Sequence, residues 1–168
     1  SLLKTLRVND YDMAYLYIGQ GLPLVCVHGS LNDFRAWTAV LSPLSSNHRL
    51  IVPSLRHYFP EQWDGQGGKF KMAQHVDDVI AFVEGLGLGP VDLLGHSRGG
   101  HLAFRMALKR PDLIRKLVLA EPGGTLEDAL MPDNADDGAP AAGSRAHVAQ
   151  ASEKIAAGDL EGGLRAFI

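Results

Sequence analysis

Features that would assign a protein to a specialised class are scarce or missing in this sequence. Its single cysteine, Cys26, excludes an internal disulfide and stands in an apolar run without a basic neighbour, which favours a buried strand residue over a reactive thiol. No apolar run approaches the roughly 20 residues of a membrane-spanning helix. The net charge of −3 gives no electrostatic basis for binding nucleic acid or an anionic membrane. Histidine, cysteine and carboxylate side chains nowhere stand at metal-ligand spacing.

Sorting signals are missing as well, and the composition is that of an ordinary globular domain. Residues 1–4 contain no basic segment followed by an apolar one, so we expect no signal peptide and a cytoplasmic location. The absence of an initiator methionine indicates a trimmed chain. Hydrophobic residues make up 46% of the chain and charged residues 21%, which is typical of a domain with one buried core. We therefore expect a small-molecule substrate as the partner, and no nucleic acid, membrane, metal or cofactor.

The sequence does contain an alternation of short apolar runs and helical patterns. Apolar runs predict strands at residues 6–8, 13–18, 24–27, 50–52, 91–94 and 117–119, the first two as an antiparallel pair. Helical spacing predicts helices at residues 35–44, 72–86 and 98–109. In the helix at 72–86 the apolar residues form one face, and polar residues including Asp78 form the other. This order predicts a doubly wound α/β fold with a mostly parallel sheet.

The composition changes after Glu121. Residues 131–144 are rich in Ala, Gly, Pro and Asp and predict a mobile loop, whereas residues 152–168 form a weakly amphipathic helical stretch. We therefore place a core with six strands at residues 1–124, and a flexible loop followed by a helical segment at residues 125–168.

One local pattern points to chemistry. Residues 95–99, Gly-His-Ser-Arg-Gly, follow the predicted strand at 91–94 and precede the predicted helix at 98–109. A serine on so sharp a turn takes a strained backbone conformation, which requires residues without bulky side chains two positions before and after it. Its hydroxyl then stands over the positive end of the helix. A plain Gly-Ser turn is the alternative, but the strand–turn–helix context favours Ser97 as a nucleophile.

Four segments together resemble the α/β-hydrolase superfamily: residues 24–37, 51–56, 95–100 and 117–122. The resemblance covers about residues 6–121, and the most similar members are small-molecule esterases, carbon–carbon bond hydrolases and cofactor-free haloperoxidase-like enzymes. It implies that Ser97 attacks a carbonyl, that an acyl-enzyme forms, and that water releases the product. It also implies that residues 152–168 begin the helical cap that these proteins insert after the sixth strand.

The resemblance implies further site residues. In this family a His-Gly pair after the third strand begins the loop that supplies half of the oxyanion hole, so the backbone N–H of Ser30 is one expected donor and that of Arg98 the other. An ordinary turn relieved by Gly29 is the alternative. Glu121, at the end of the sixth strand, is a candidate acid, because the haloalkane dehalogenases use a carboxylate there to orient the histidine. Many serine relatives carry an acid at that place without this role.

Two departures from the family pattern matter. The usual Pro-Asp-Leu-Arg-Gly is Pro-Ser-Leu-Arg-His at residues 53–57, which bears on loop structure more than on catalysis. The family's histidine follows the eighth strand and its usual acid the seventh, and both lie beyond these residues. We therefore expect an N-terminal part of the fold that lacks the last strands and is inactive alone. None of the chain's histidines stands at the base position, and His28 is expected to brace the oxyanion loop.

The main hypothesis is a serine hydrolase that acts on a small ester or related acyl or carbonyl substrate. The serine at position 97 argues against dehalogenase or epoxide-hydrolase chemistry, since those relatives use an aspartate there. The alternative is a non-catalytic ligand-binding or sensing module on the same scaffold. Apolar surface left by absent strands would favour homo-oligomers. The Arg98 side chain has three open roles: contact with an anionic substrate, exposure to solvent, or pairing with a carboxylate.

Overall fold

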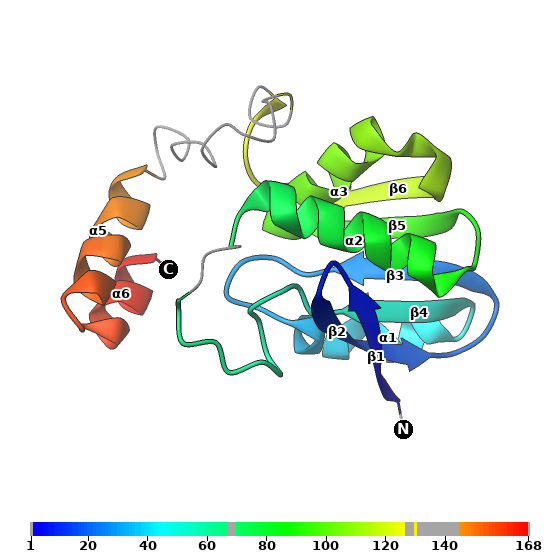
Figure 1. Cartoon of the computed structure of the whole chain (residues 1–168), viewed down its shortest axis with the longest axis horizontal. Helices are drawn as coiled ribbons and strands as arrows, with labels where there is room; N and C mark the ends of the chain where they lie inside the picture. Colours follow the sequence, from blue (N-terminus) through cyan, green and yellow to red (C-terminus); the bar gives the residue numbers. More distant parts are fainter. Residues whose placement is uncertain (1, 67–69, 127–129, 131–144, 168) are drawn as a thin grey trace. The chain divides into compact units, whose positions relative to one another are not determined.

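The computed structural model describes residues 2–66, 70–126, 130 and 145–167 (Figure 1). Contacts divide the chain into two units, residues 1–123 and residues 124–168. The first unit carries the sheet with its covering helices, and the described part of the second unit carries two helices. The mobile loop predicted at residues 131–144 lies outside the described residues.

The first unit is built on one six-stranded sheet. In chain order its strands are β1 (Leu3–Val8), β2 (Tyr11–Ile18), β3 (Leu22–Val27), β4 (His48–Pro53), β5 (Val91–His96) and β6 (Ile114–Ala120). They lie side by side in the order β1-β2-β4-β3-β5-β6. β2 is antiparallel to β1 and β4, whereas β4, β3, β5 and β6 are parallel to one another. The prediction of a mostly parallel α/β sheet is confirmed.

Helices cover both faces of this sheet. They are η1 (Phe34–Trp37), α1 (Thr38–Ser45), α2 (Met72–Leu86), α3 (Arg98–Lys109) and η2 (Pro111–Leu113). Successive residues of a strand point to opposite faces, so Val25 and Val27 of β3 pack in one core cluster with α2 and α3. Leu24 and Cys26 of the same strand pack in a second cluster with η1 and α1. The two clusters are the two sides of a doubly wound fold.

The strand order brings two loops together at one edge of the sheet. β3 lies between β4 and β5, and Val27 pairs with Gly95 near the carboxyl ends of both strands. The loops that follow β3 and β5 therefore begin side by side. In open α/β sheets, ligands bind outside the carboxyl ends of the strands at such a switch in strand order.

The second unit contains the described helices α5 (Arg145–Ala156) and α6 (Leu160–Phe167). The single helical stretch predicted at residues 152–168 is thus divided. Gly158 adopts φ +86° between the two helices, a conformation that ends α5 and that glycine adopts without strain. Gly163 is buried, and a Cβ there would stand 2.5 Å from Ile155 Cγ1, so this glycine lets the two helices approach closely.

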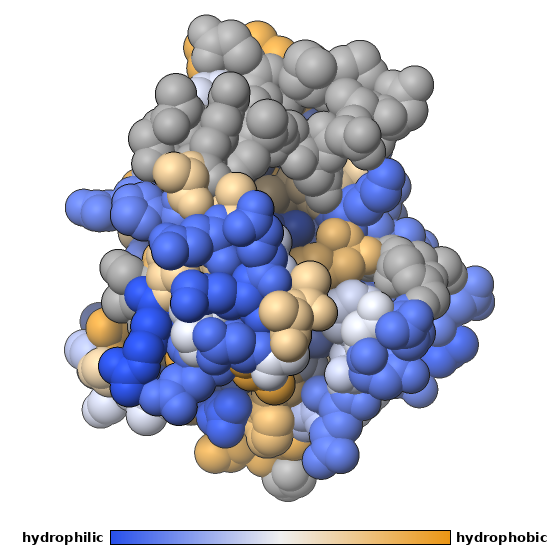
Figure 2. All heavy atoms as spheres, turned by 90° about the vertical axis from the view of Figure 1, so that its left-hand side faces the viewer, coloured by the Kyte–Doolittle hydropathy of each residue, from blue (hydrophilic) through white to orange (hydrophobic). Residues whose placement is uncertain are grey.

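In the part of the chain that the structure describes, no helix is both long and apolar enough to cross a bilayer. On the face drawn in Figure 2, hydrophilic residues predominate and hydrophobic residues gather in small separate groups. Val118 of β6 is 52% exposed, at the edge of the described sheet.

Candidate active site

Ser97 lies on the turn between β5 and α3, with φ +52° and ψ −122°. This conformation is rare for a residue with a side chain, and it persists only where the surroundings hold it. Here the Ser97 N–H donates to the Ala120 carbonyl at 3.1 Å, and the Ser97 carbonyl accepts from the N–H groups of Gly100 and Gly123, both at 2.9 Å. The backbone of Ser97 is therefore fixed by β6, by α3 and by the segment after β6.

The glycines on either side of Ser97 are required by close backbone contacts. A Cβ on Gly95 would stand 2.3 Å from the Gly99 carbonyl oxygen, and a Cβ on Gly99 would stand 2.4 Å from the carbonyl oxygens of both Val27 and His28. Real Cβ atoms do not approach backbone oxygen so closely. The absence of side chains at these positions lets the start of α3 lie against the end of β3.

The loop after β3 lies directly against Ser97. A Cβ on Gly29 would stand 3.0 Å from the Ser97 Cβ, so Gly29 leaves no room for a side chain between the loop and the turn. Ser30, the next residue, is half-buried. The structure therefore brings three of the predicted site residues into one place: Ser97, Arg98 and Ser30.

His28 holds this loop from inside the protein. It is fully buried, its Nδ1 lies 2.8 Å from the Gly29 carbonyl oxygen, and the Leu55 N–H donates to its Nε2 at 3.0 Å. Because Nε2 accepts, the proton resides on Nδ1 and is donated to Gly29. Burial lowers the pKa of His28 to about 4. His28 is therefore a neutral link between the loop after β3 and the loop after β4, as expected of a brace.

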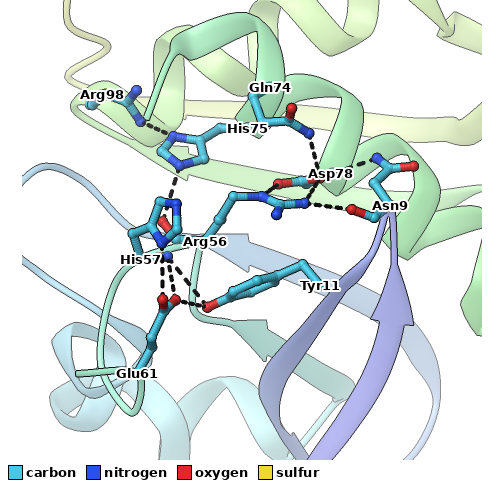
Figure 3. Close-up of polar contacts among 9 residues, drawn as sticks. All are labelled: Asn9, Tyr11, Arg56, His57, Glu61, Gln74, His75, Asp78 and Arg98. Atoms are coloured by element: carbon cyan, nitrogen blue, oxygen red, sulfur yellow. Dashed lines mark hydrogen bonds and ion pairs between the residues drawn. The ribbon is translucent and has the colours of Figure 1, made fainter. Parts of the chain in front are cut away.

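One partner of the Arg98 side chain is a neutral ring, a contact that is not among the three roles left open by the sequence. Its Nη1 lies 2.8 Å from Nδ1 of His75, and its Cζ lies 5.6 Å from the centre of the Phe70 ring. His75 lies in the first turn of α2 and is fully buried. Its Nε2 lies 3.1 Å from the Arg56 carbonyl oxygen. Figure 3 shows this chain of contacts from Arg98 to the loop after β4. Burial, with the Arg98 charge, lowers the pKa of His75 to about 3.

Arg56 and Asp78 form a buried ion pair beside His75. Arg56 Nε lies 2.7 Å from Asp78 Oδ2 and Arg56 Nη2 lies 2.9 Å from Oδ1, with the two side chains 4% and 0% exposed (Figure 3). The placement of Asp78 on the solvated face of α2 is therefore wrong. The helical pattern could not show that an arginine 22 residues earlier compensates the buried carboxylate.

The remaining residues of the segment 53–57 also have structural partners. The Ser54 hydroxyl is buried and accepts from the Phe34 N–H at 3.1 Å. His57 has φ +69°, at the position where the family pattern has glycine. Its Nδ1 lies 3.0 Å from Glu61, and its ring stacks on Trp63 at 4.2 Å and 13°. These contacts hold His57 in a backbone conformation that residues with a side chain ordinarily avoid. The stacking also shows that Trp63 packs within its own loop.

A cleft of about 440 Å³ lies elsewhere in the first unit, and no predicted site residue lines it. It opens beside the β1–β2 hairpin and the loop after β4, with Arg7, Asp10, Tyr11, Asp12, Ala14, Ser54, Pro60 and Glu61 around it. Among the described residues, no group of three or more histidine, cysteine or carboxylate side chains is arranged to hold a metal ion.

Comparison with known proteins decides the family. A family model described as alpha/beta hydrolase fold matches residues 23–143. The chain belongs to the α/β-hydrolase fold family. The resemblance stated from the sequence is confirmed, and the match covers β3 to β6 together with the turn that carries Ser97.

Relatives in this family include hydrolases with different printed activities. The chain is 32% identical over 114 residues to a soluble epoxide hydrolase of Corynebacterium sp. strain C12, covering 68% of this chain and 39% of that protein. It is 30% identical over 124 residues to a 2-hydroxymuconate semialdehyde hydrolase of Pseudomonas sp. strain CF600, covering 71% and 41%. The chain thus spans about two fifths of the length of these curated relatives.

Solved α/β-hydrolase structures agree with the fold. An epoxide hydrolase from Vigna radiata superimposes with a TM-score of 0.64 at 27% identity, covering 68% of this chain and 38% of that one. A meta-cleavage product hydrolase carrying an A129V mutation gives a TM-score of 0.65 at 25% identity, covering 73% and 46%. The similarity extends to hydrolases of more than one reaction type, so the family by itself does not assign the substrate.

Among the described residues of the first unit, no hydrogen bond joins the Ser97 hydroxyl to a histidine ring or to a carboxylate. Glu121 is exposed one residue beyond Ala120, the residue whose carbonyl accepts the Ser97 N–H. No histidine ring within the described ranges is hydrogen-bonded to the Ser97 hydroxyl. His28 and His75 use their ring nitrogens in internal bonds, and His147 belongs to the second unit.

Proposed function

We propose that this chain carries the nucleophile of a serine hydrolase, which acts on a small ester or related acyl or carbonyl substrate. The observation that carries the proposal is the backbone of Ser97, held at φ +52° at the N-terminus of α3 with Gly29 against it. Residues held in such strained conformations cluster at active sites and ligand clamps. The membership in a family of hydrolases supports the same reaction class.

The proposed reaction has two stages. The Ser97 oxygen attacks the substrate carbonyl carbon, the carbonyl electrons move to its oxygen, and collapse of this intermediate expels the leaving group, which takes up the serine proton. Water then attacks the acyl-enzyme and releases the acid with Ser97 regenerated. The backbone N–H groups of Ser30 and Arg98 are the proposed oxyanion donors, each contributing about 3 kcal/mol to the transition state. The general base would be a residue outside the described set, and Glu121 is a candidate acid.

The test is covalent labelling of the natural full-length protein with a fluorophosphonate, followed by peptide mass spectrometry. We expect the adduct on Ser97, with none in Ser97→Ala. Ser42→Ala, which removes an exposed hydroxyl from α1, is the matched control and should label as the wild type does. Absence of labelling in the wild type, or labelling that survives Ser97→Ala, contradicts the proposal.

A panel of substrates separates this reaction from those of the relatives. A serine hydrolase should turn over aryl or alkyl esters, and Ser97→Ala should abolish that turnover. Turnover of an epoxide that persists in Ser97→Ala would instead favour a different nucleophile. Tight ligand binding with no turnover, unchanged in Ser97→Ala, would support the sensing module.

A further inference from the structure

The segment that follows β6 holds the backbone of Ser97 at both its polar groups. The Ala120 carbonyl accepts the Ser97 N–H at 3.1 Å, and the Gly123 N–H donates to the Ser97 carbonyl at 2.9 Å. Glu121, between these two residues, adopts φ +46°, a conformation that a residue with a side chain ordinarily avoids. The chain therefore turns sharply at the end of β6, and this turn brings Gly123 to Ser97.

The Ser97 carbonyl oxygen accepts three hydrogen bonds in all. Two of them come from the N–H groups of Gly100 at 2.9 Å and His101 at 3.1 Å, as is usual at the start of a helix. A carbonyl oxygen has two lone pairs, so these two bonds already satisfy it. The bond from Gly123 is thus an additional one, and it is supplied from outside α3.

Gly123 lies against the peptide that joins Ser97 to Arg98. A Cβ at Gly123 would stand 3.5 Å from both the Ser97 carbonyl carbon and the Arg98 nitrogen, which is ordinary van der Waals contact. The φ of Gly123 is not positive. Neither contact with described residues nor backbone conformation therefore excludes a side chain at this position. What the structure uses there is the N–H.

The peptide that accepts this bond is also the one that carries the Arg98 N–H, a proposed oxyanion donor. A hydrogen bond accepted by the carbonyl of a peptide polarises the peptide and strengthens the bond that its N–H donates. We propose that Gly123 is a positioning residue, whose N–H orients and polarises the Ser97–Arg98 peptide so that the Arg98 N–H binds the oxyanion more strongly. This inference rests on the proposed serine mechanism. Gly123 itself neither gains nor loses a proton.

The test replaces the Gly123 amide by an ester in the natural full-length protein. Gly123→glycolic acid, introduced with a chemically acylated tRNA, exchanges the N–H for an oxygen atom and adds no side chain. The readout is the first-turnover rate of Ser97 acylation by p-nitrophenyl acetate. An oxyanion donor contributes a factor of roughly 10²–10³ to the rate, and polarisation strengthens a hydrogen bond by roughly 10–30%, so acylation should slow by about two- to eightfold. KM should change little, and the affinity for a trifluoromethyl ketone, which forms an oxyanion on Ser97, should fall by the same factor.

Two comparisons separate this effect from a general cost of the ester. Gly87→glycolic acid makes the same exchange at the end of α2, where the Gly87 N–H donates to the Glu84 carbonyl at 3.1 Å, and it should leave the rate unchanged. Gly123→Ala and Gly123→lactic acid share one side chain and differ only in N–H against oxygen. The alanine variant should acylate faster than the lactic acid variant by the same two- to eightfold factor, about that of the first pair.

Equal acylation rates within the pair at position 123, or a loss in Gly87→glycolic acid as large as that in Gly123→glycolic acid, would overturn the inference. If the ester variants lose their fold in thermal melts, the wild type decides the matter. Its Gly123 amide proton should shift downfield in the NMR spectrum when the trifluoromethyl ketone adduct forms, and an unchanged resonance would contradict the inference. Failure of the proposed function is distinguishable, because the wild type itself would then form no adduct at Ser97.

Discussion

Replacing Asp78 with asparagine tests the ion pair that joins α2 to the loop after β4. The Asp78 carboxylate is 0% exposed and accepts from Arg56 Nε, Arg56 Nη2, Gln74 Nε2 and Asn9 Nδ2 at 2.7 to 3.1 Å. Every one of these partners is a donor. An asparagine can turn its single oxygen towards one side only, and its NH2 then faces a donor while the buried guanidinium loses its counter-charge.

The expected cost follows from this geometry. Removing one partner of a buried pair destabilises a protein by about 3–5 kcal/mol, and we place Asp78→Asn near the lower value, because the amide still accepts on one side. For a chain of this size the loss corresponds to a decrease in Tm of roughly 6 to 12 °C. Urea unfolding followed by circular dichroism and a thermal melt measure the two quantities.

The adjacent residue supplies the control. Asp77 is half-exposed and lies 2.9 Å from Lys109, so Asp77→Asn makes the same chemical change in a surface pair and should cost less than about 1 kcal/mol. The reasoning is refuted if Asp78→Asn costs no more than Asp77→Asn. The double variant Arg56→Met with Asp78→Leu should recover most of the loss, since it leaves no uncompensated charge in the core.

Three further predictions concern the site and its surroundings. Ser97→Gly relieves the strain of the positive φ, so it should stabilise the protein by about 1 kcal/mol in urea unfolding, and it should abolish labelling. A variant no more stable than the wild type would contradict the inference that Ser97 is strained. His28 and His75 have pKa values lowered to about 4 and about 3, so acidification below the usual histidine pKa protonates the unfolded chain first. Stability should therefore be full near pH 7 and decline from about pH 6.5 towards pH 4, and a Tm that stays level over that range would contradict it. Burial raises the pKa of Cys26 to about 12, so a thiol reagent should modify it only after unfolding.

The sequence by itself determined the features that depend on neighbours along the chain. α3 occupies Arg98–Lys109 as predicted, because the turn before it and Pro111 after it are local signals. The need for glycines around Ser97 also followed from local steric reasoning, although the oxygens that a Cβ would meet belong partly to β3. The alternation of apolar runs with helical patterns was sufficient to predict the class of fold, since continuous apolar runs reflect burial on both faces of a parallel sheet.

Only the tertiary structure decided which distant residues meet. The strand order places β3 between β4 and β5, and this alone sets Gly29 against Ser97. It also brings the loop after β4 to α2, where the buried Arg56 and Asp78 compensate each other and His75 reaches Arg98. Helical periodicity predicts the burial of a residue from its own polarity alone, whereas the burial of a charge depends on a partner far along the chain. For that reason the sequence could indicate Ser97 as a candidate nucleophile, but it could not show that His75 contacts the arginine beside it.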